Sequence, residues 1–138
     1  MKDLKNNLLG AVTIPPQAIT SNATTTGTGV DLRGYEGALV VLFSGTIAGS
    51  SSANIHTPEV QESDSSDTGF TAVANADLIG LESDAVLNGG TDSTVKTIGY
   101  IGAKRYIRVV DTTTAFTTAG GVIGALIIKG AAHAKPAA

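Results

Sequence analysis

The residues Ala38-Leu39-Val40-Val41-Leu42-Phe43 form an unbroken apolar run that ends at Ser44 and Gly45. A short apolar run bounded by turn residues is typical of a strand in the middle of a sheet. We therefore predict that this strand lies at the centre of the fold and is buried on both faces. A carboxylate at Val41 would then have no compensating partner, so Val41→Asp is expected to prevent folding.

Strand signals recur on both sides of this run at roughly ten-residue spacing, and helical periodicity is absent. Residues 55–62 and 70–73 flank a turn rich in Ser and Asp, which predicts a hairpin. Residues 94–101 and 104–111 are separated only by Gly102 and Ala103, which predicts a second, tight hairpin. Residues 120–129 read as the last core strand. The pattern predicts an all-β fold, an antiparallel β-sandwich of about eight strands, with a jelly roll as one arrangement that fits.

The N-terminal region differs from the rest because Pro15 and Pro16 fix the backbone φ angle and remove two hydrogen-bond donors. This stretch is expected to be an extended N-terminal arm or an edge strand. We therefore divide the chain into an arm with a Thr-rich loop at 1–29, a β-sandwich domain at 30–130 and a flexible tail at 131–138.

Composition limits the classes of function. The chain has 138 residues, no cysteine, 15% charged residues and a formal net charge of −3. The absence of cysteine excludes disulfides and zinc–thiolate sites. Nucleic-acid binding needs clustered Lys and Arg, and no apolar run is long enough to span a bilayer. We expect neither nucleic acid nor a membrane as a partner.

Catalytic and metal-binding patterns receive little support. His56 could serve a hydrolase only if the fold placed it beside a carboxylate in a pocket, and the sequence holds no Gly-x-Ser-x-Gly nucleophile motif. Glu62, Asp64 and Asp67 could offer oxygens to calcium, but their spacing is not that of an EF-hand, and a solvated turn explains them as well. We predict that the protein is not an enzyme and binds no cofactor.

Two segments are candidates for partner contacts. Lys104, Arg105 and Arg108 form the densest basic set of the chain and could bind an acidic protein surface. The alternative is a solvated strand with Tyr106 packed between charged stems. The second candidate is the arm segment Ile14-Pro15-Pro16.

Three stretches together resemble a family of small structural proteins of tailed bacteriophages. They are Gly34-Tyr35-Glu36-Gly37-Ala38-Leu39-Val40-Val41, then Glu59-Val60-Gln61-Glu62-Ser63-Asp64 with Phe70-Thr71-Ala72-Val73, and Ile98-Gly99-Tyr100-Ile101-Gly102-Ala103-Lys104-Arg105-Tyr106-Ile107-Arg108-Val109. The resemblance covers about residues 30–111 and supplies no catalytic residues.

This resemblance implies a virion component, a capsid decoration (cement) protein that binds the major capsid protein and stabilises the lattice. It further implies a location on the capsid surface, after a period in the host cytoplasm during assembly. We expect a homo-oligomer, with a trimer favoured. The alternative is a tail-associated or carbohydrate-binding module that recognises the host.

Overall fold

The computed structural model describes residues 2–117 and 120–137. Within them the chain is all-β, with two antiparallel sheets and two short 3-10 helices, η1 (Asn75–Asp77) and η2 (Glu82–Ala85). The first sheet has the order β1 (Leu9–Ile19), β10 (Gly121–Ala132), β4 (Tyr35–Ile47), β8 (Val95–Tyr100) and β7 (Leu78–Ile79). The second has the order β2 (Thr24–Thr26), β9 (Tyr106–Thr114), β5 (Ile55–Ser63) and β6 (Thr71–Ala72), and β3 (Val30–Asp31) also pairs with β9.

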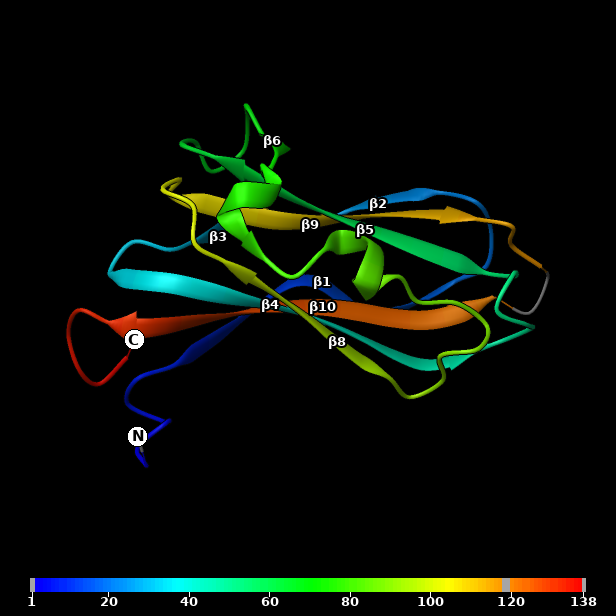
Figure 1. Cartoon of the computed structure of the whole chain (residues 1–138), viewed down its shortest axis with the longest axis horizontal. Coiled ribbons are helices and arrows are strands. Elements are labelled where there is room, and N and C mark those ends of the chain that lie inside the picture. Colours follow the sequence, from blue (N-terminus) through cyan, green and yellow to red (C-terminus); the bar gives the residue numbers. More distant parts are fainter. Residues whose placement is uncertain (1, 118–119, 138) are drawn as a thin grey trace.

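The two sheets form two layers, with β9, β5 and β2 above β10, β4 and β1 in Figure 1. Successive long strands alternate between layers, since β4, β8 and β10 belong to the first sheet and β5 and β9 to the second. The long strands that pair with one another are therefore far apart in the chain. The predicted all-β sandwich is confirmed, and the jelly-roll arrangement stays a prediction.

The core lies between the layers and is almost entirely aliphatic. Val40, Ile98 and Ile127 enter it from the first sheet, and Val60 and Val109 from the second, each at most 1% exposed. Small branched side chains can fill such a gap because strand residues alternate between faces, so each strand contributes every second residue. This packing compensates for the small number of aromatic residues, of which Tyr100 lies in the buried core.

β4 is central to the first sheet as predicted, but the expectation that it is buried on both faces is wrong. Val40 and Leu42 face the core, whereas Leu39, Val41 and Phe43 face outward and are partly exposed. A continuous apolar run does not reveal whether a second layer covers the other side of a strand. Val41 is therefore not the core position that the sequence suggested.

The predicted pairing of 55–62 with 70–73 is confirmed by the register Gln61↔Ala72, although β6 is only two residues long. The second predicted hairpin is wrong, because β8 pairs with β4 while β9 pairs with β5. The short link between β8 and β9 crosses from one sheet to the other. Gly102 permits this crossing: a Cβ there would lie 2.6 Å from the hydroxyl oxygen of Tyr100.

Of the two alternatives for the N-terminal region, the structure has the edge strand. β1 pairs with β10 from Leu9↔Lys129 to Ile19↔Gly121, with irregularities around the prolines. The hydroxyl of Thr13 donates to the carbonyl of Thr28 and accepts from the amide of Val109, which ties β1 to the second sheet. The expected boundary at residue 29 therefore does not separate an arm from the sandwich, because β1 and β2 are strands of its two sheets.

The C-terminal region continues the last strand beyond the expected boundary at residue 130. β10 runs to Ala132, and the amide of His133 donates to the carbonyl of Gly34. The amide of Ala137 donates to the carbonyl of Asn6, so the two ends of the described chain lie together. The flexibility expected of residues 131–138 stays a prediction, and Ala138 lies outside the described residues.

We predict that adjacent positions of β4 respond oppositely to the same substitution. Val40→Asp is expected to abolish cooperative unfolding, because it places an unpaired carboxylate in the core. Val41→Asp is expected to fold, since its side chain reaches the outer surface. Circular dichroism and urea denaturation of both variants test this, and failure of Val41→Asp to fold would contradict the outward orientation of that residue.

Candidate interaction surface

The first sheet packs against the second sheet with one of its two faces, and no other element in the described part of the chain forms a layer on its other face (Figure 1). Alternation along β1, β10, β4, β8 and β7 places one set of side chains on this face. In register these rows are Gly10, Ile128, Leu39, Gly99 and Ile79; Val12, Leu126, Val41 and Thr97; Gly124, Phe43 and Val95; and Ala18 with Val122. We call this set the outer face.

Large apolar side chains are unusually accessible here. Val12 is 56% exposed, Ile79 62% and Val95 62%, and Leu39 and Val122 are exposed as well. These five are most of the exposed large apolar residues among the described positions. Contiguous apolar surface of this kind costs free energy in water and marks interaction sites in soluble proteins.

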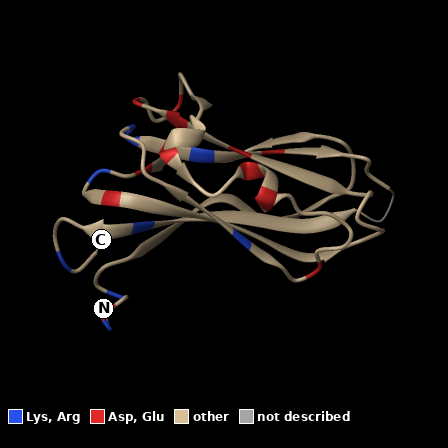
Figure 2. Cartoon of the chain, in the orientation of Figure 1, with Lys and Arg blue, Asp and Glu red and all other residues tan. Residues whose placement is uncertain are grey.

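Charge is absent from the outer face as the described strands define it. Among the residues of the rows named above, Thr97 carries the one polar side chain, and the charged residues of these strands, Glu36, Lys96 and Lys129, occupy the alternate positions. Beyond these rows, Tyr35 has the same alternation, and Nζ of Lys129 lies 4.7 Å from its ring centroid. Figure 2 shows acidic and basic residues gathered mainly around the second sheet and the loops. A partner of this face can therefore be attracted by apolar contact and shape, and by little else.

Glycines make the outer face smooth. The ring of Phe43 lies over Gly124, where a Cβ would come within 2.6 Å of the ring, and Ile79 lies over Gly99 in the same way at 3.0 Å. Side chains that lie flat on neighbouring glycines leave few projections. At one end, a hollow of about 420 Å³ opens between Leu8 and the outer-face rows. Gly37, Gly130, Leu39 and Ile128 line it, and so does Glu36, the one charged residue at this edge of the face among the residues that line the hollow.

The basic set predicted from the sequence lies at the second sheet, and each member has a partner within the chain. Lys104 pairs with Asp64, and the guanidinium of Arg105 forms two hydrogen bonds, 2.8 and 3.0 Å long, with the carboxylate of Asp31. Arg108 donates twice to the side-chain oxygen of Gln61 and lies 4.1 Å above the ring of Phe70. These partners satisfy much of the binding capacity of the set, although Lys104 and Arg105 remain partly exposed.

The hydrogen bonds from Arg105 lower the pKa of Asp31 to about 2, from an ordinary value of 3.8. The carboxylate thus stays ionised well into acid. Since the pKa is depressed in the folded state, the pair stabilises the fold above about pH 4, and this contribution is lost as the pH falls toward 2. Both side chains are more than a third exposed, so the contribution is small.

The other predicted contact segment divides in two. Ile14 is 1% exposed and belongs to the core, so its assignment as a partner-binding residue is wrong. Pro15 and Pro16 are exposed on the edge strand β1, where they remain available to a partner. The sequence did not distinguish these neighbours, because the irregular register around the prolines decides which residue turns inward.

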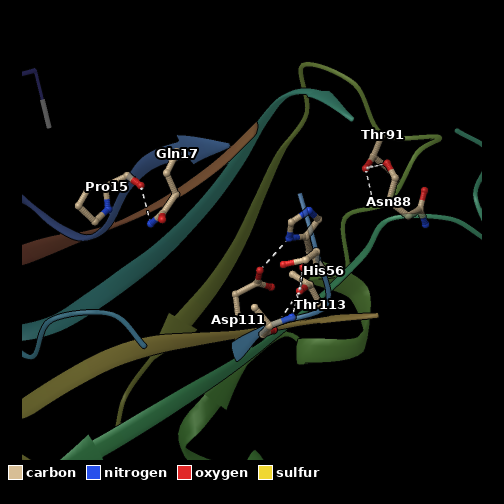
Figure 3. A network of polar contacts seen from close by, with 9 residues as sticks. Pro15, Gln17, His56, Asn88, Thr91, Asp111 and Thr113 are labelled. Carbon is tan, nitrogen blue, oxygen red and sulfur yellow. Dashed lines mark hydrogen bonds and ion pairs between the residues drawn. The ribbon is translucent and has the colours of Figure 1, made fainter. Parts of the chain in front are cut away.

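His56 does meet a carboxylate. Its Nδ1 lies 2.7 Å from Oδ2 of Asp111, on neighbouring strands β5 and β9, and both side chains are 2% exposed (Figure 3). The imidazole also packs edge-on against Phe116, with ring centroids 5.3 Å apart. Nε2 of His56 and Oδ1 of Asp111 are buried without a hydrogen-bond partner.

The His56–Asp111 pair has the composition of a catalytic dyad but not its setting. A general base must reach a proton of the substrate, whereas these atoms lie in the interior. The best-formed hollows of the described surface are lined by other residues. The arrangement thus holds β5 and β9 together through a buried polar contact.

The three acidic residues considered above as calcium ligands, Glu62, Asp64 and Asp67, each contact a different partner. Glu62 accepts a 2.6 Å hydrogen bond from the hydroxyl of Tyr100, Asp64 pairs with Lys104, and Asp67 accepts from Ser66. Burial, and next the bond to Glu62, raise the pKa of Tyr100, which keeps its hydroxyl protonated as a donor. Within residues 2–117 and 120–137 no three His, Asp or Glu side chains are grouped to hold a metal ion.

Comparison with known proteins adds no identification: no protein-family model matches the chain, and no curated protein matches it. The resemblance to phage structural proteins thus stays a hypothesis that the sequence motivates.

We predict that Arg105→Gln raises the pKa of the Asp31 carboxyl from about 2 toward its ordinary value of 3.8, because the guanidinium hydrogen bonds are lost. Carboxyl carbon NMR during a pH titration measures this shift. Arg33→Gln serves as control, since Arg33 reaches Asp31 mainly through its backbone amide. An unchanged titration of Asp31 in Arg105→Gln would show that the pair does not form in solution.

We also predict that Asp111→Ala lowers the free energy of unfolding by about 3 kcal/mol, because it leaves a buried imidazole nitrogen without its partner. Urea denaturation measures the loss. The matched control is Asp67→Ala at an exposed turn, for which we expect a change below about 0.5 kcal/mol. Equal stability of the two variants would argue against a buried His56–Asp111 contact.

Proposed function

We propose that this protein is a structural component of a bacteriophage particle that binds the outside of the capsid and stabilises the lattice. The observation that carries the proposal of a role in an assembly is the uncharged, apolar outer face, which self-association would cover. A chain that worked alone in water would gain nothing from such a face, whereas a chain that works inside an assembly keeps it covered.

The strand order supports a role in assembly as well. Two-layered sheets with jelly-roll connectivity occur in viral capsid proteins, and also in lectins. This is support by analogy of fold, which does not by itself define a function. The family resemblance of residues 30–111 favours the virion over the lectin.

The partner in this proposal is the major capsid protein, and the surface available to it is the rest of the sandwich. Pro15 and Pro16 are exposed along β1, and Lys104, Arg105 and Arg108 border the second sheet. Repetition of the lattice allows weak contacts to add up, because each bound copy places its neighbours at high effective concentration. The protein would act on the capsid surface after assembly in the host cytoplasm.

Self-association is part of the same proposal; the sequence favours a trimer. Nucleic acid is not proposed as a partner, since Lys104 and Arg105 are paired with carboxylates of the same chain and the formal net charge is −3. Among the described residues, no helix has the length and apolar character needed to cross a bilayer.

Purified particles of the phage that encodes this chain provide the test. We expect the chain in stoichiometric amounts relative to the major capsid protein by quantitative mass spectrometry. Particles that lack it should release DNA at a lower temperature, measured by dye accessibility during heating, and added protein should restore the original temperature. A particle without the chain, or with a few copies at the tail tip together with glycan binding, would favour the host-recognition alternative instead.

A further inference from the structure

We propose that the outer face of the first sheet binds the same face of a second copy of this chain. The inference rests on the self-association part of the proposed function and is independent of the capsid. It follows from the charge, the shape and the area of the face, taken in turn.

Charge selects the kind of partner. The strands offer Thr97 as the one polar side chain of the outer face, so a partner with charged or amide groups there would lose their hydration and gain nothing in return. A second copy presents an equally uncharged surface. The net charge of −3, which would repel another copy elsewhere, lies on other parts of the molecule.

Shape is matched for the same reason. Two sheets with the same right-handed twist stack face to face with their strands about 30° apart, and identical sheets share the same twist. The rings and side chains that lie over Gly124 and Gly99 keep the face free of projections that would hold the layers apart. Val12, Ile79 and Val95 then lose their contact with water.

The area suffices for a stable contact. Strands of 11, 12, 13, 6 and 2 residues make up the sheet. At about 3.3 Å per residue and about 4.8 Å between strands, the whole sheet covers roughly 700 Å², which includes the end rows Gly130↔Gly37 and Ala132↔Tyr35 beyond the outer face. Two copies would bury about 1,400 Å² together, within the range of about 1,200–2,000 Å² for specific interfaces.

A contact between identical faces closes at two copies, because each copy uses its only such face in the described sheet. The proposal therefore predicts a dimer in place of the trimer that the sequence favoured. A dimer also buries β4 and β10 on both sides, as their apolar sequences suggest.

Sedimentation equilibrium of the purified protein, without capsids, tests the proposal. We expect the wild type to be a dimer and Leu39→Glu to weaken association at least about 100-fold, because the interface would bury an unpaired carboxylate. Leu81→Glu is the matched control: Leu81 is 50% exposed but lies outside the outer face, so this variant should associate like the wild type. Circular dichroism verifies that both variants fold, and Val95→Glu replaces Leu39→Glu if that variant does not.

Solvent accessibility provides a second measurement. A soluble paramagnetic probe should leave the methyl signals of Val12 and Val95 protected in the wild type and broaden them in Leu39→Glu. A monomeric wild type would overturn the proposal, and so would a trimer or a dimer that Leu39→Glu and Val95→Glu leave intact. None of these outcomes bears on whether the chain occurs in virions, so the two proposals fail separately.

Discussion

The fold depends on the packing of branched aliphatic side chains between two antiparallel sheets. β4 and β10 contribute much of this packing, because β4 from Val40 to Ile47 and β10 from Gly121 to Ile127 supply buried residues at most alternate positions. The chain lacks Trp and has few aromatic residues, so the layers must approach closely and evenly. Tight contacts at Gly27 and Gly102 belong to this requirement, since a side chain at either would collide with Thr13 or Tyr100.

The same two strands explain the exposed surface. In both strands the residues that point toward the core and most of those that point away from it are apolar. The side of the sheet that does not face the core is therefore apolar as well. A sheet that worked with one side in water would alternate between apolar and polar residues. The apolar character of the outer face is thus a direct result of the amino-acid sequences of β4 and β10. Substitutions in several rows of residues would be needed to make this face polar.

The sequence predicts local structure well and long-range pairing poorly. The apolar runs of β4 and β10 and the turn before β6 were identified because strand and turn preferences act over a few residues. The allocation of β8 and β9 to different sheets was missed, because the apolar runs suggested a two-residue hairpin loop, whereas the strands end earlier and residues 101–105 link them. Ile14 was misplaced for a similar reason: irregular register near Pro15 and Pro16 cannot be derived from composition. The His56–Asp111 contact joins residues 55 positions apart and has no sequence signal.

The lack of polar groups on the outer face has a consequence for selectivity. Discrimination between partners usually comes from groups that a wrong partner would leave unpaired, and Thr97 is the one such side chain that the sheet presents there. Discrimination between partners must therefore depend on the shape of the surface, which the ring of Phe43 over Gly124 and the hollow beside Leu8 determine. Exchange of one aliphatic residue for another would leave affinity nearly intact while changing which surfaces fit. Aliphatic substitutions alone can therefore change which partner binds the outer face, and no charged residue has to be introduced.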